Sequence, residues 1–231
     1  GKVYSSQSQL VSTKGADIRP DNSFNYSWRV RVWDETDTPS EWSSEAKFRA
    51  VPERLSSSGQ WIGAITRQNA HLPEGRKFHG GELKKPEVKA AWEAVDTLAK
   101  KSICLRRTFQ VGDATEGGTN RKPGKKIVEA TAYVCGLGFY EFSLNGQKVG
   151  NSEFAPLWSD YDKTVYYNTY DVTEQLRRGE NVVGILLGNG FYNVQGGRYR
   201  KLQISFGPPT LLFELVINYE DGTCTTVHSD N

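Results

Sequence analysis

The chain has 231 residues, of which 37% are hydrophobic and 12% aromatic, so it can bury a substantial core and is long enough for one large or two smaller domains. Its 29 Lys and Arg residues nearly balance its 27 Asp and Glu residues, and a net charge of +2 gives no electrostatic basis for binding nucleic acid or an anionic membrane. No apolar run approaches the roughly 18 residues that a membrane span needs. We therefore expect an uncharged partner, no nucleic acid and no membrane span.

The beginning of the chain indicates a part of a longer polypeptide. It starts with Gly1, the whole sequence contains no Met, and the first residues, GKVYSSQSQL, lack the apolar core of a signal peptide. We expect any targeting sequence to lie outside these residues.

Residues 24–33, FNYSWRVRVW, alternate apolar and polar side chains, which is the pattern of a half-buried strand. A polar loop, DETDTPSEWSS, leads to a second predicted strand, EAKFRAV, and the two strands form a hairpin. This hairpin resembles the last two strands of a fibronectin type III or immunoglobulin-like sandwich. Such a sandwich needs ~100 residues. We therefore interpret residues 1–51 as the C-terminal part of such a domain.

Residues 52–102 are predicted to form a linker with one short strand, WIGAI, and one helix. In KKPEVKAAWEAVDTLAKKS, apolar residues recur at three- and four-residue spacing, and Pro86 suits a first helical turn. We expect an amphipathic helix that lies against the neighbouring sheet, with a partner-binding helix as the alternative. Its apolar residues are Val88, Ala91, Trp92, Val95, Leu98 and Ala99.

From residue 103 onward every apolar run is typical of a strand. Asn145-Gly146 and Asp221-Gly222 are strong hairpin signals between such runs. Many short strands separated by turns predict an all-β fold, an antiparallel sandwich or jelly roll, and argue against a catalytic α/β architecture. The predicted strands are ICLRRTFQV, IVEATAYVCGLG, FYEFSLNG, KTVYYNTYDV, NVVGILLGNG and TLLFELVINYEDGTCTTV.

The three cysteines, Cys104, Cys135 and Cys224, each lie in one of these strands, and their spacing matches no zinc pattern. We expect buried free thiols that act as small apolar side chains.

No catalytic residue is predicted. Hydrolysis of a glycoside needs two carboxyl groups a few ångströms apart in a cleft. Glu141 is expected to point outward from a strand, Asp171 or Thr173 to cap a short helical turn, and Asp160 and Asp162 to be solvated. The sequence also has no nucleophile elbow, phosphate loop or His-Glu-x-x-His motif.

Two segments instead suggest a binding surface for a neutral sugar, which aromatic faces and nearby polar groups hold together. The segment PLWSDYDK supplies two rings, of Trp158 and Tyr161, and the carboxylate of Asp160, and LGNGFYNVQGGRYR supplies polar groups on a glycine-rich loop. The alternative is that the rings plug the ends of the sandwich. The sugar-binding residues that we predict are Trp158, Asp160, Asn189 and Tyr192, with Tyr161, Asn193, Gln195 and Arg198 nearby.

A family resemblance rests on these same segments. The runs GLGFYEFSLNGQKVG and WSDYDKTVYYNTYDVTEQLRRGENVVGILLGNGFYN resemble the N-terminal β-sandwich domain of bacterial α-L-rhamnosidases, over residues 103–231. The shorter pattern of L-N-G-x-x-V-G followed by D-V-T-x-x-L-x-x-G-E-N also occurs in galactose-binding-like jelly rolls of other glycoside hydrolases. The preceding YSWRVRVWDETDTPSEWS resembles the fibronectin-like module that comes before this domain in the same enzymes.

The resemblance implies an inverting, periplasmic or secreted hydrolase that removes terminal α-L-rhamnose from glycans. Its catalytic acids belong to a downstream (α/α)6 barrel, whose signature does not occur in these residues, so this chain alone is expected to be inactive. Its implied partners are a rhamnose-containing glycan and that barrel. Related jelly rolls bind rhamnose through calcium, but Asn151 stands where similar sequences often have Asp. The alternative function is an independent carbohydrate-binding module of another secreted or periplasmic protein.

Overall fold

The computed structural model of the chain describes residues 25–49, 58–64, 76–79, 101–112, 125–194 and 202–230, together with residues 4, 55, 85 and 86. The chain divides into two compact units, residues 1–55 and residues 56–231. The described part contains no helix with the length and hydropathy that a membrane crossing requires.

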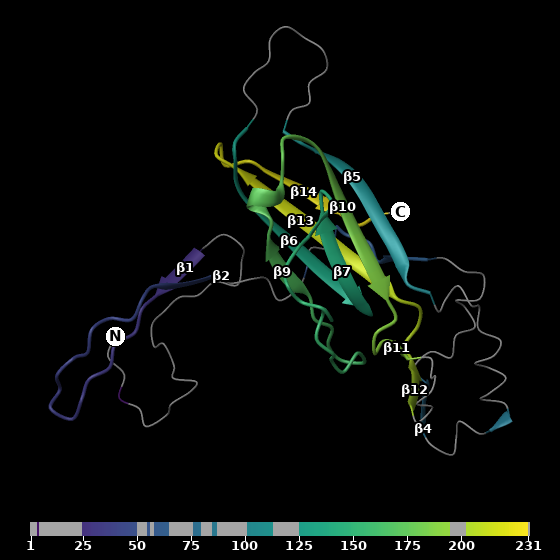
Figure 1. The fold of residues 1–231 in the computed structure, drawn as a ribbon, viewed down its shortest axis with the longest axis horizontal. Coiled ribbons are helices and arrows are strands. Elements are labelled where there is room, and N and C mark those ends of the chain that lie inside the picture. Colours follow the sequence, from purple (N-terminus) through teal and green to yellow (C-terminus); the bar gives the residue numbers. More distant parts are fainter. Residues whose placement is uncertain are drawn as a thin grey trace, which may run out of the picture. The chain divides into compact units, whose positions relative to one another are not determined.

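In the first unit, β1 (Asn25–Trp28) pairs antiparallel with β2 (Ala46–Arg49) (Figure 1). The strand predicted over residues 24–33 is therefore shorter than expected. Beyond Trp28 the hairpin continues without a regular ladder, because serine hydroxyls replace backbone carbonyls as acceptors. The Ser43 hydroxyl accepts a hydrogen bond from the Val30 N–H at 3.0 Å, and the Ser40 hydroxyl accepts one from the Val32 N–H at 3.1 Å.

Alternating arginine and tryptophan side chains hold the irregular part of this hairpin. The Arg31 guanidinium lies 5.0 Å from the centroid of the Trp33 ring and 4.5 Å from that of Trp42, and the Arg29 guanidinium lies 5.3 Å from Trp42. Each contact is a cation–π interaction. The contacts connect Trp42 to the segment of residues 29–33, which follows β1.

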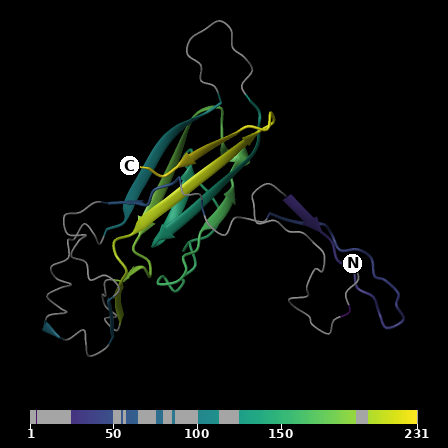
Figure 2. The ribbon, with the colours of Figure 1, turned by 180° about the vertical axis from the view of Figure 1, so that it is seen from behind.

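The second unit is built around two antiparallel sheets that lie face to face (Figures 1 and 2). The first sheet has the order β5-β10-β7-β8, and the second has the order β14-β13-β6-β9, with β3 paired to β13. From behind, β13 and β14 face the viewer (Figure 2). The strands of the first sheet are β5 (Ile103–Val111), β7 (Phe139–Leu144), β8 (Gln147–Lys148) and β10 (Gly179–Gly188). Those of the second are β3 (Ile62–Gly63), β6 (Ile127–Leu137), β9 (Asn168–Asp171), β13 (Thr210–Tyr219) and β14 (Cys224–His228).

A smaller sheet of order β11-β12-β4 lies at the end of the sandwich to which β10 leads (Figure 1). Its strands are β4 (Arg76–His79), β11 (Asn193–Val194) and β12 (Leu202–Ser205). A short 3-10 helix, η4 (Thr173–Gln175), follows β9. Its N-cap residue is Val172, with no side-chain capping hydrogen bond, so neither Asp171 nor Thr173 caps the turn as the sequence predicted. The Asp171 Oδ1 instead accepts hydrogen bonds from the backbone N–H of Thr173 at 3.0 Å and from the Thr173 hydroxyl at 2.6 Å.

The core lies between the two sheets, where strand alternation turns every second side chain inward. Phe142 of β7 meets Phe213 of the opposite sheet at a centroid distance of 5.7 Å. Full burial of such side chains stabilises the fold by ~1.5–3 kcal/mol each. The inward rows are Phe109 and Val111; Tyr140, Phe142 and Leu144; Val183, Ile185 and Leu187; Ala130, Ala132 and Val134; and Leu211, Phe213, Leu215 and Ile217.

Two predicted turns set the strand register. Asn145 and Gly146 both have positive φ, 53° and 80°, as a two-residue turn of type I′ requires between β7 and β8. Between β13 and β14 only Gly222 has positive φ, 78°, and the Tyr219 N–H donates to the Thr223 carbonyl at 2.9 Å.

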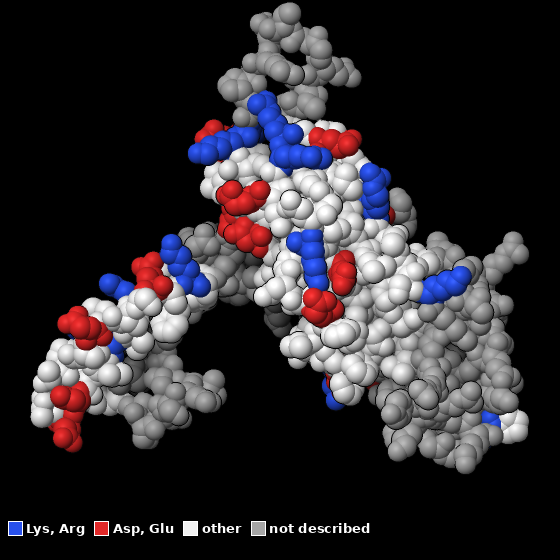
Figure 3. All heavy atoms as spheres, viewed as in Figure 1, with Lys and Arg blue, Asp and Glu red and all other residues white. Residues whose placement is uncertain are grey.

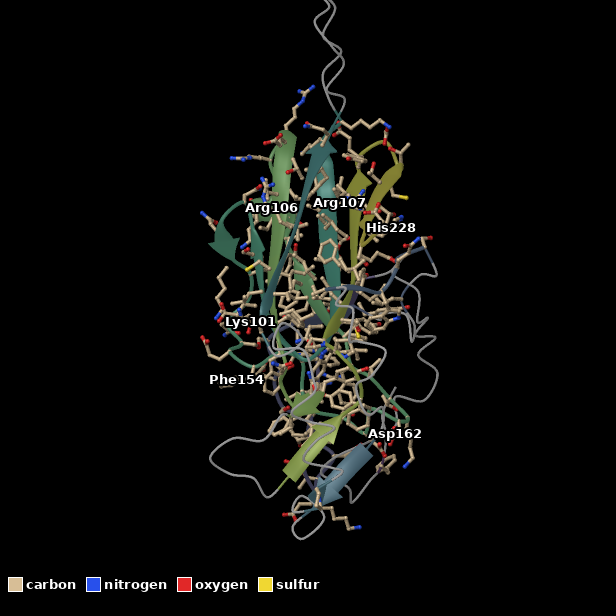
Figure 4. All side chains as sticks on the ribbon, turned by 90° about the vertical axis from the view of Figure 1, so that its right-hand side faces the viewer. Lys101, Arg106, Arg107, Phe154, Asp162 and His228 are labelled. Atoms are coloured by element: carbon tan, nitrogen blue, oxygen red, sulfur yellow. The ribbon has the colours of Figure 1, made fainter. Side chains whose placement is uncertain are left out.

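The edges of the two sheets are joined at β5 and β14. The Arg107 guanidinium donates to the His228 carbonyl at 2.7 Å and forms an ion pair with Asp230. Figure 4 shows Arg107 and His228 side by side on neighbouring strands. Ser229, which follows β14, accepts a backbone hydrogen bond from Gln60 at 2.9 Å and so attaches the segment before β3.

Several expectations differ from the structure. The strand predicted as KTVYYNTYDV contains only β9, because the residues before Asn168 form a loop over the sheet. Cys135 is buried as expected, but Cys104 and Cys224 are exposed, since they lie on outward positions of edge strands. The short linker strand is present as β3, whereas residues 87–100, with the predicted amphipathic helix, lie outside the described residues.

Candidate functional site

The two loops that carry the predicted sugar-binding residues lie side by side at one end of the sandwich. The first loop, residues 149–167, joins β8 to β9, and the second, residues 189–192, joins β10 to β11. Trp158 of the first loop stacks on Phe191 of the second, with ring centroids 5.2 Å apart and an interplanar angle of 26°. The two segments that the sequence suggested as a binding surface therefore meet in the structure.

Backbone pairing fixes the first loop where it passes β7. The Tyr140 N–H donates to the Ala155 carbonyl at 2.8 Å, and these two residues form an isolated antiparallel bridge. Ala155 turns its methyl group into the core. Because neighbouring side chains in extended backbone point to opposite faces, Phe154 is directed to the solvent.

Gly138 of the G-L-G motif and Gly190 of the L-G-N-G motif allow close backbone contacts beneath the ring of Phe191. A Cβ on Gly138 would lie 2.1 Å from the Gly188 carbonyl oxygen, and a Cβ on Gly190 would lie 2.8 Å from the Phe139 nitrogen. Only glycine permits these approaches. The G-L-G and L-G-N-G motifs are therefore in contact, and this contact positions Phe191 over Phe139.

Four large apolar side chains, Phe154, Leu157, Trp158 and Phe191, form what we call the aromatic patch. Their exposed fractions are 72%, 77%, 61% and 44%. Phe139 lies beneath the patch, with its ring centroid 5.5 Å from that of Phe154 and 5.6 Å from that of Phe191. Figure 4 shows Phe154 projecting away from the sandwich, on the side opposite Asp162.

A second, half-buried group of rings lies next to the aromatic patch. Tyr161 makes edge contacts with Tyr192 and Phe206, at 5.2 and 5.3 Å between centroids, and Tyr192 stacks on Phe206. The Tyr192 hydroxyl donates to the Phe206 carbonyl at 3.0 Å. Burial raises the pKa of Tyr161 above its ordinary value. This group is part of the packing at the end of the sandwich, as the alternative interpretation predicted.

The predicted sugar-binding residues differ in how accessible their polar groups are to a ligand. The Asn189 side-chain oxygen accepts a hydrogen bond from Asn193 Nδ2 at 2.9 Å, and Asn193 is fully buried. Asp160 is exposed and pairs with Lys163 at 3.0 Å. Trp158 and Asp160 are thus accessible to a ligand, whereas Asn189 and Tyr192 make internal hydrogen bonds. Gln195 and Arg198 lie outside the described residues.

Two described acids near the aromatic patch, Glu141 and Glu153, form ion pairs with one lysine. Glu141 points outward from β7, and Lys148 lies 3.8 Å from its carboxylate and 3.0 Å from that of Glu153. All three side chains are solvent-accessible, so these carboxylates lack the enclosed setting of a glycosidase pair. On the face drawn in Figure 3, described charged residues of both signs are interspersed.

The residues around Asn151 do not fit a calcium site. Calcium takes six to eight oxygen ligands, usually with several carboxylates. Asn151 is exposed, Glu153 is engaged with Lys148, and within the described ranges no group of three or more His, Cys, Asp and Glu side chains is placed to hold a metal ion.

Sequence reasoning missed three members of the aromatic patch, Phe154, Leu157 and Phe191. The signal was present in the run EFAPLW, where apolar residues follow the predicted hairpin without the alternation of a strand. The sequence could not show the bridge between Tyr140 and Ala155, and this bridge determines that Phe154 points outward.

Comparisons with known proteins agree on the nature of both units. Residues 125–231 match the family model described as "Alpha-L-rhamnosidase N-terminal domain", and residues 1–51 match "Rha78A-like, N-terminal immunoglobulin domain". The chain is 34% identical to a curated α-L-rhamnosidase of Formosa agariphila over 99% of its own length, which is 22% of that protein. It thus spans about a fifth of this relative.

Solved structures give the same result. An α-L-rhamnosidase of Dictyoglomus thermophilum superposes with a TM-score of 0.60 and 26% identity, and one of Aspergillus terreus with a TM-score of 0.58 and 26% identity. In both cases the match covers 89% of this chain and 20% of the other chain.

Proposed function

The chain consists of N-terminal domains of the α-L-rhamnosidase family, and from this premise we propose that it is the noncatalytic N-terminal part of an enzyme that removes terminal α-L-rhamnose from glycans. The observation that carries the proposal is the end-to-end match to a much longer α-L-rhamnosidase. In this proposal the chain contributes architecture, and catalysis belongs to the four fifths of the relative that the chain does not match. Within the chain, we assign residues 103–231 to the jelly-roll domain.

The setting of the described acids supports a noncatalytic role. Glu141 and Glu153 flank a lysine on an open sheet surface, and the exposed Asp171 accepts hydrogen bonds from Thr173. The general acid of a glycosidase lies in an enclosed site, whereas these carboxylates are open to solvent.

The purified 231-residue chain is accordingly expected not to hydrolyse an aryl α-L-rhamnoside. Release of the aryl group is followed spectroscopically at high protein concentration, after a second chromatographic step to exclude contaminating enzyme. Turnover that stays with the chain through that step would defeat the proposal.

A second candidate function is direct contact with a rhamnose-containing glycan through Trp158, Asp160, Asn189 and Tyr192. One observation favours it: one face of Trp158 is supported by Phe191 while the side chain stays exposed, which is how an indole presents a face to a sugar ring. Because the Asn189 oxygen and the Tyr192 hydroxyl make internal hydrogen bonds, the contact would depend on Trp158 and Asp160.

Titration with L-rhamnose tests this second function. A site of this kind would bind in the millimolar range, about −4 kcal/mol, and would shift amide resonances of both loops. Trp158→Ala should abolish those shifts, whereas Trp61→Ala, at another exposed tryptophan, should leave them unchanged. Absence of shifts at saturating sugar would leave the loops as packing elements.

We also propose a periplasmic or secreted location for the parent enzyme. Fractionation of cells that express the intact gene distinguishes this from retention in the cytoplasm.

A further inference from the structure

The aromatic patch is more apolar than a small sugar site requires. Phe154, Leu157, Trp158 and Phe191 are all substantially exposed. Phe139 contacts the rings of Phe154 and Phe191 at 5.5 and 5.6 Å between centroids, and Trp158 joins the cluster through Phe191 at 5.2 Å. A cluster of exposed apolar side chains of this kind marks an interaction surface.

The patch is held in place by the backbone. The bridge between Tyr140 and Ala155 directs Phe154 outward, and the close approach of Gly190 to Phe139 fixes the start of the second loop. Side chains that are already ordered lose little conformational entropy on binding. The arrangement therefore suits docking onto a matching surface.

The geometry favours an apolar protein surface over a sugar. The Phe139 ring is tilted by 54° from that of Phe154 and by 89° from that of Phe191, so the rings do not form one flat platform. On the side of Phe154, the ion pair between Lys148 and Glu153 adds a polar edge, and protein interfaces combine an apolar centre with a polar rim.

We propose that the aromatic patch docks onto the catalytic part of the same polypeptide; this rests on the proposed function. Its support is that the chain covers only 22% of a relative that it matches from end to end, so in such a protein most of the molecule is available as a covalently attached partner. Attachment raises the effective concentration of the partner to about the millimolar range, so a small apolar contact is sufficient. Docking would hold the N-terminal domains in a fixed position on the enzyme.

Oxidative footprinting of the intact enzyme that carries this chain tests the docking. In the chain itself Trp158 is more exposed than Trp61, so an undocked Trp158 should be oxidised at least as fast as Trp61. Docking predicts the reverse, with Trp158 oxidised about tenfold more slowly than Trp61, as expected for the buried centre of an interface. Phe154 and Leu157 should be protected together with it.

A matched pair of variants in the intact enzyme provides the second part of the footprinting experiment. Leu157→Glu places a charge next to Trp158 in the sequence of the patch and should bring the oxidation rate of Trp158 up to that of Trp61. Val128→Glu, at an exposed residue of β6 outside the patch, should leave the protection unchanged. Because wild-type footprinting needs no variant, a folding defect in Leu157→Glu does not remove the test.

Four outcomes would overturn the docking. Equal oxidation of Trp158 and Trp61 in an enzyme that hydrolyses rhamnosides would leave the proposed function intact and show that the patch is open. Protection that appears only on addition of L-rhamnose would assign the patch to sugar, and protection that grows with protein concentration would assign it to a second copy. Protection that persists in Leu157→Glu would place its cause outside the patch. An intact protein without rhamnosidase activity would instead defeat the proposed function.

Discussion

Asn181 shows how one buried residue connects two motifs that are far apart in the sequence. It is fully buried, and its Oδ1 accepts hydrogen bonds from the Arg177 N–H at 3.0 Å and from Asn145 Nδ2 at 2.9 Å. Its Nδ2 donates to the carbonyls of Arg177 and Gly179, at 2.6 and 2.9 Å. The L-N-G and G-E-N motifs are therefore two halves of one hydrogen-bonded unit that supports the start of β10.

Asn181→Ala should lower the free energy of unfolding by about 2–4 kcal/mol, because it leaves several buried polar groups without partners. Urea denaturation of the second unit at neutral pH measures the loss. Glu180→Gln, at the exposed neighbouring position, should change stability by less than about 0.5 kcal/mol. Equal effects of the two substitutions would show that the hydrogen bonds of Asn181 do not stabilise the fold.

A second residue gives a pH dependence with a defined sign. The hydroxyl and N–H of Thr223, at 2.6 and 3.0 Å, and the ammonium of Lys125, at 3.0 Å, lower the pKa of Asp221 to about 2. Because the pKa in the folded state is below that of an unfolded Asp, near 3.9, the contribution is complete above pH ~4 and is lost as the pH falls toward 2.

The hairpin of β13 and β14 should therefore weaken between about pH 4 and pH 2, and the carboxyl resonance of Asp221 should titrate with a midpoint near 2. Asp221→Asn should remove that part of the pH dependence, while Asp162→Asn, at an exposed loop residue, should preserve it. A midpoint near 4 for Asp221 would mean that Thr223 and Lys125 do not stabilise its charged form.

At the scale of elements, glycines determine how the strands of the first sheet meet the loops. Gly138 has φ of 132°, and a Cβ there would lie 2.1 Å from the Gly188 carbonyl oxygen. Gly222 also has positive φ, 78°, but a Cβ there would meet no atom within 4 Å. The two positions share an unfavourable backbone conformation and differ in the space that surrounds them.

Gly138→Ala should therefore destabilise the sandwich more than Gly222→Ala does. Both substitutions carry the cost of a positive φ, roughly 1 kcal/mol, and Gly138→Ala adds an overlap with backbone worth about 1–3 kcal/mol. Comparison of the thermal unfolding midpoints of the two variants separates the cost of the overlap at Gly138 from the cost of the positive φ. A Gly138→Ala variant as stable as Gly222→Ala would mean that β7 and β10 shift apart without cost.

The elements that the sequence predicted well are those with strong local signals. The predicted strand ICLRRTFQV coincides with β5, and Asn145-Gly146 forms the predicted hairpin turn. Residues 163–172 were predicted as a single strand because their aromatic content is typical of strands, but only β9 pairs with β6. Tyr166 and Tyr167 instead cover the outer face of β6: the Cys135 thiol donates to the Tyr166 carbonyl at 3.3 Å, and burial raises the pKa of Cys135 to about 11.

At the scale of the whole molecule, the sequence identified the two loops of the candidate site but not the balance of their chemistry. Trp158 of the first loop and Phe191 of the second meet in the structure. Asn189 is engaged with Asn193, and the loop start is held by the close approaches of Gly138 to Gly188 and of Gly190 to Phe139, which are long-range contacts that no local pattern encodes. The result is an end of the sandwich that is more apolar, and less suited to hydrogen bonding with a sugar, than its composition indicated.

The most direct measurement compares rhamnoside hydrolysis by the 231-residue chain with hydrolysis by the intact polypeptide that its gene encodes. We predict that the intact protein releases L-rhamnose from an α-L-rhamnoside with inversion, observed by NMR as the β-anomer forming first, and that the 231-residue chain releases none. Hydrolysis by the chain alone, or an intact protein that is inactive on α-L-rhamnosides, would contradict the assignment of this chain as the noncatalytic N-terminal part of an α-L-rhamnosidase.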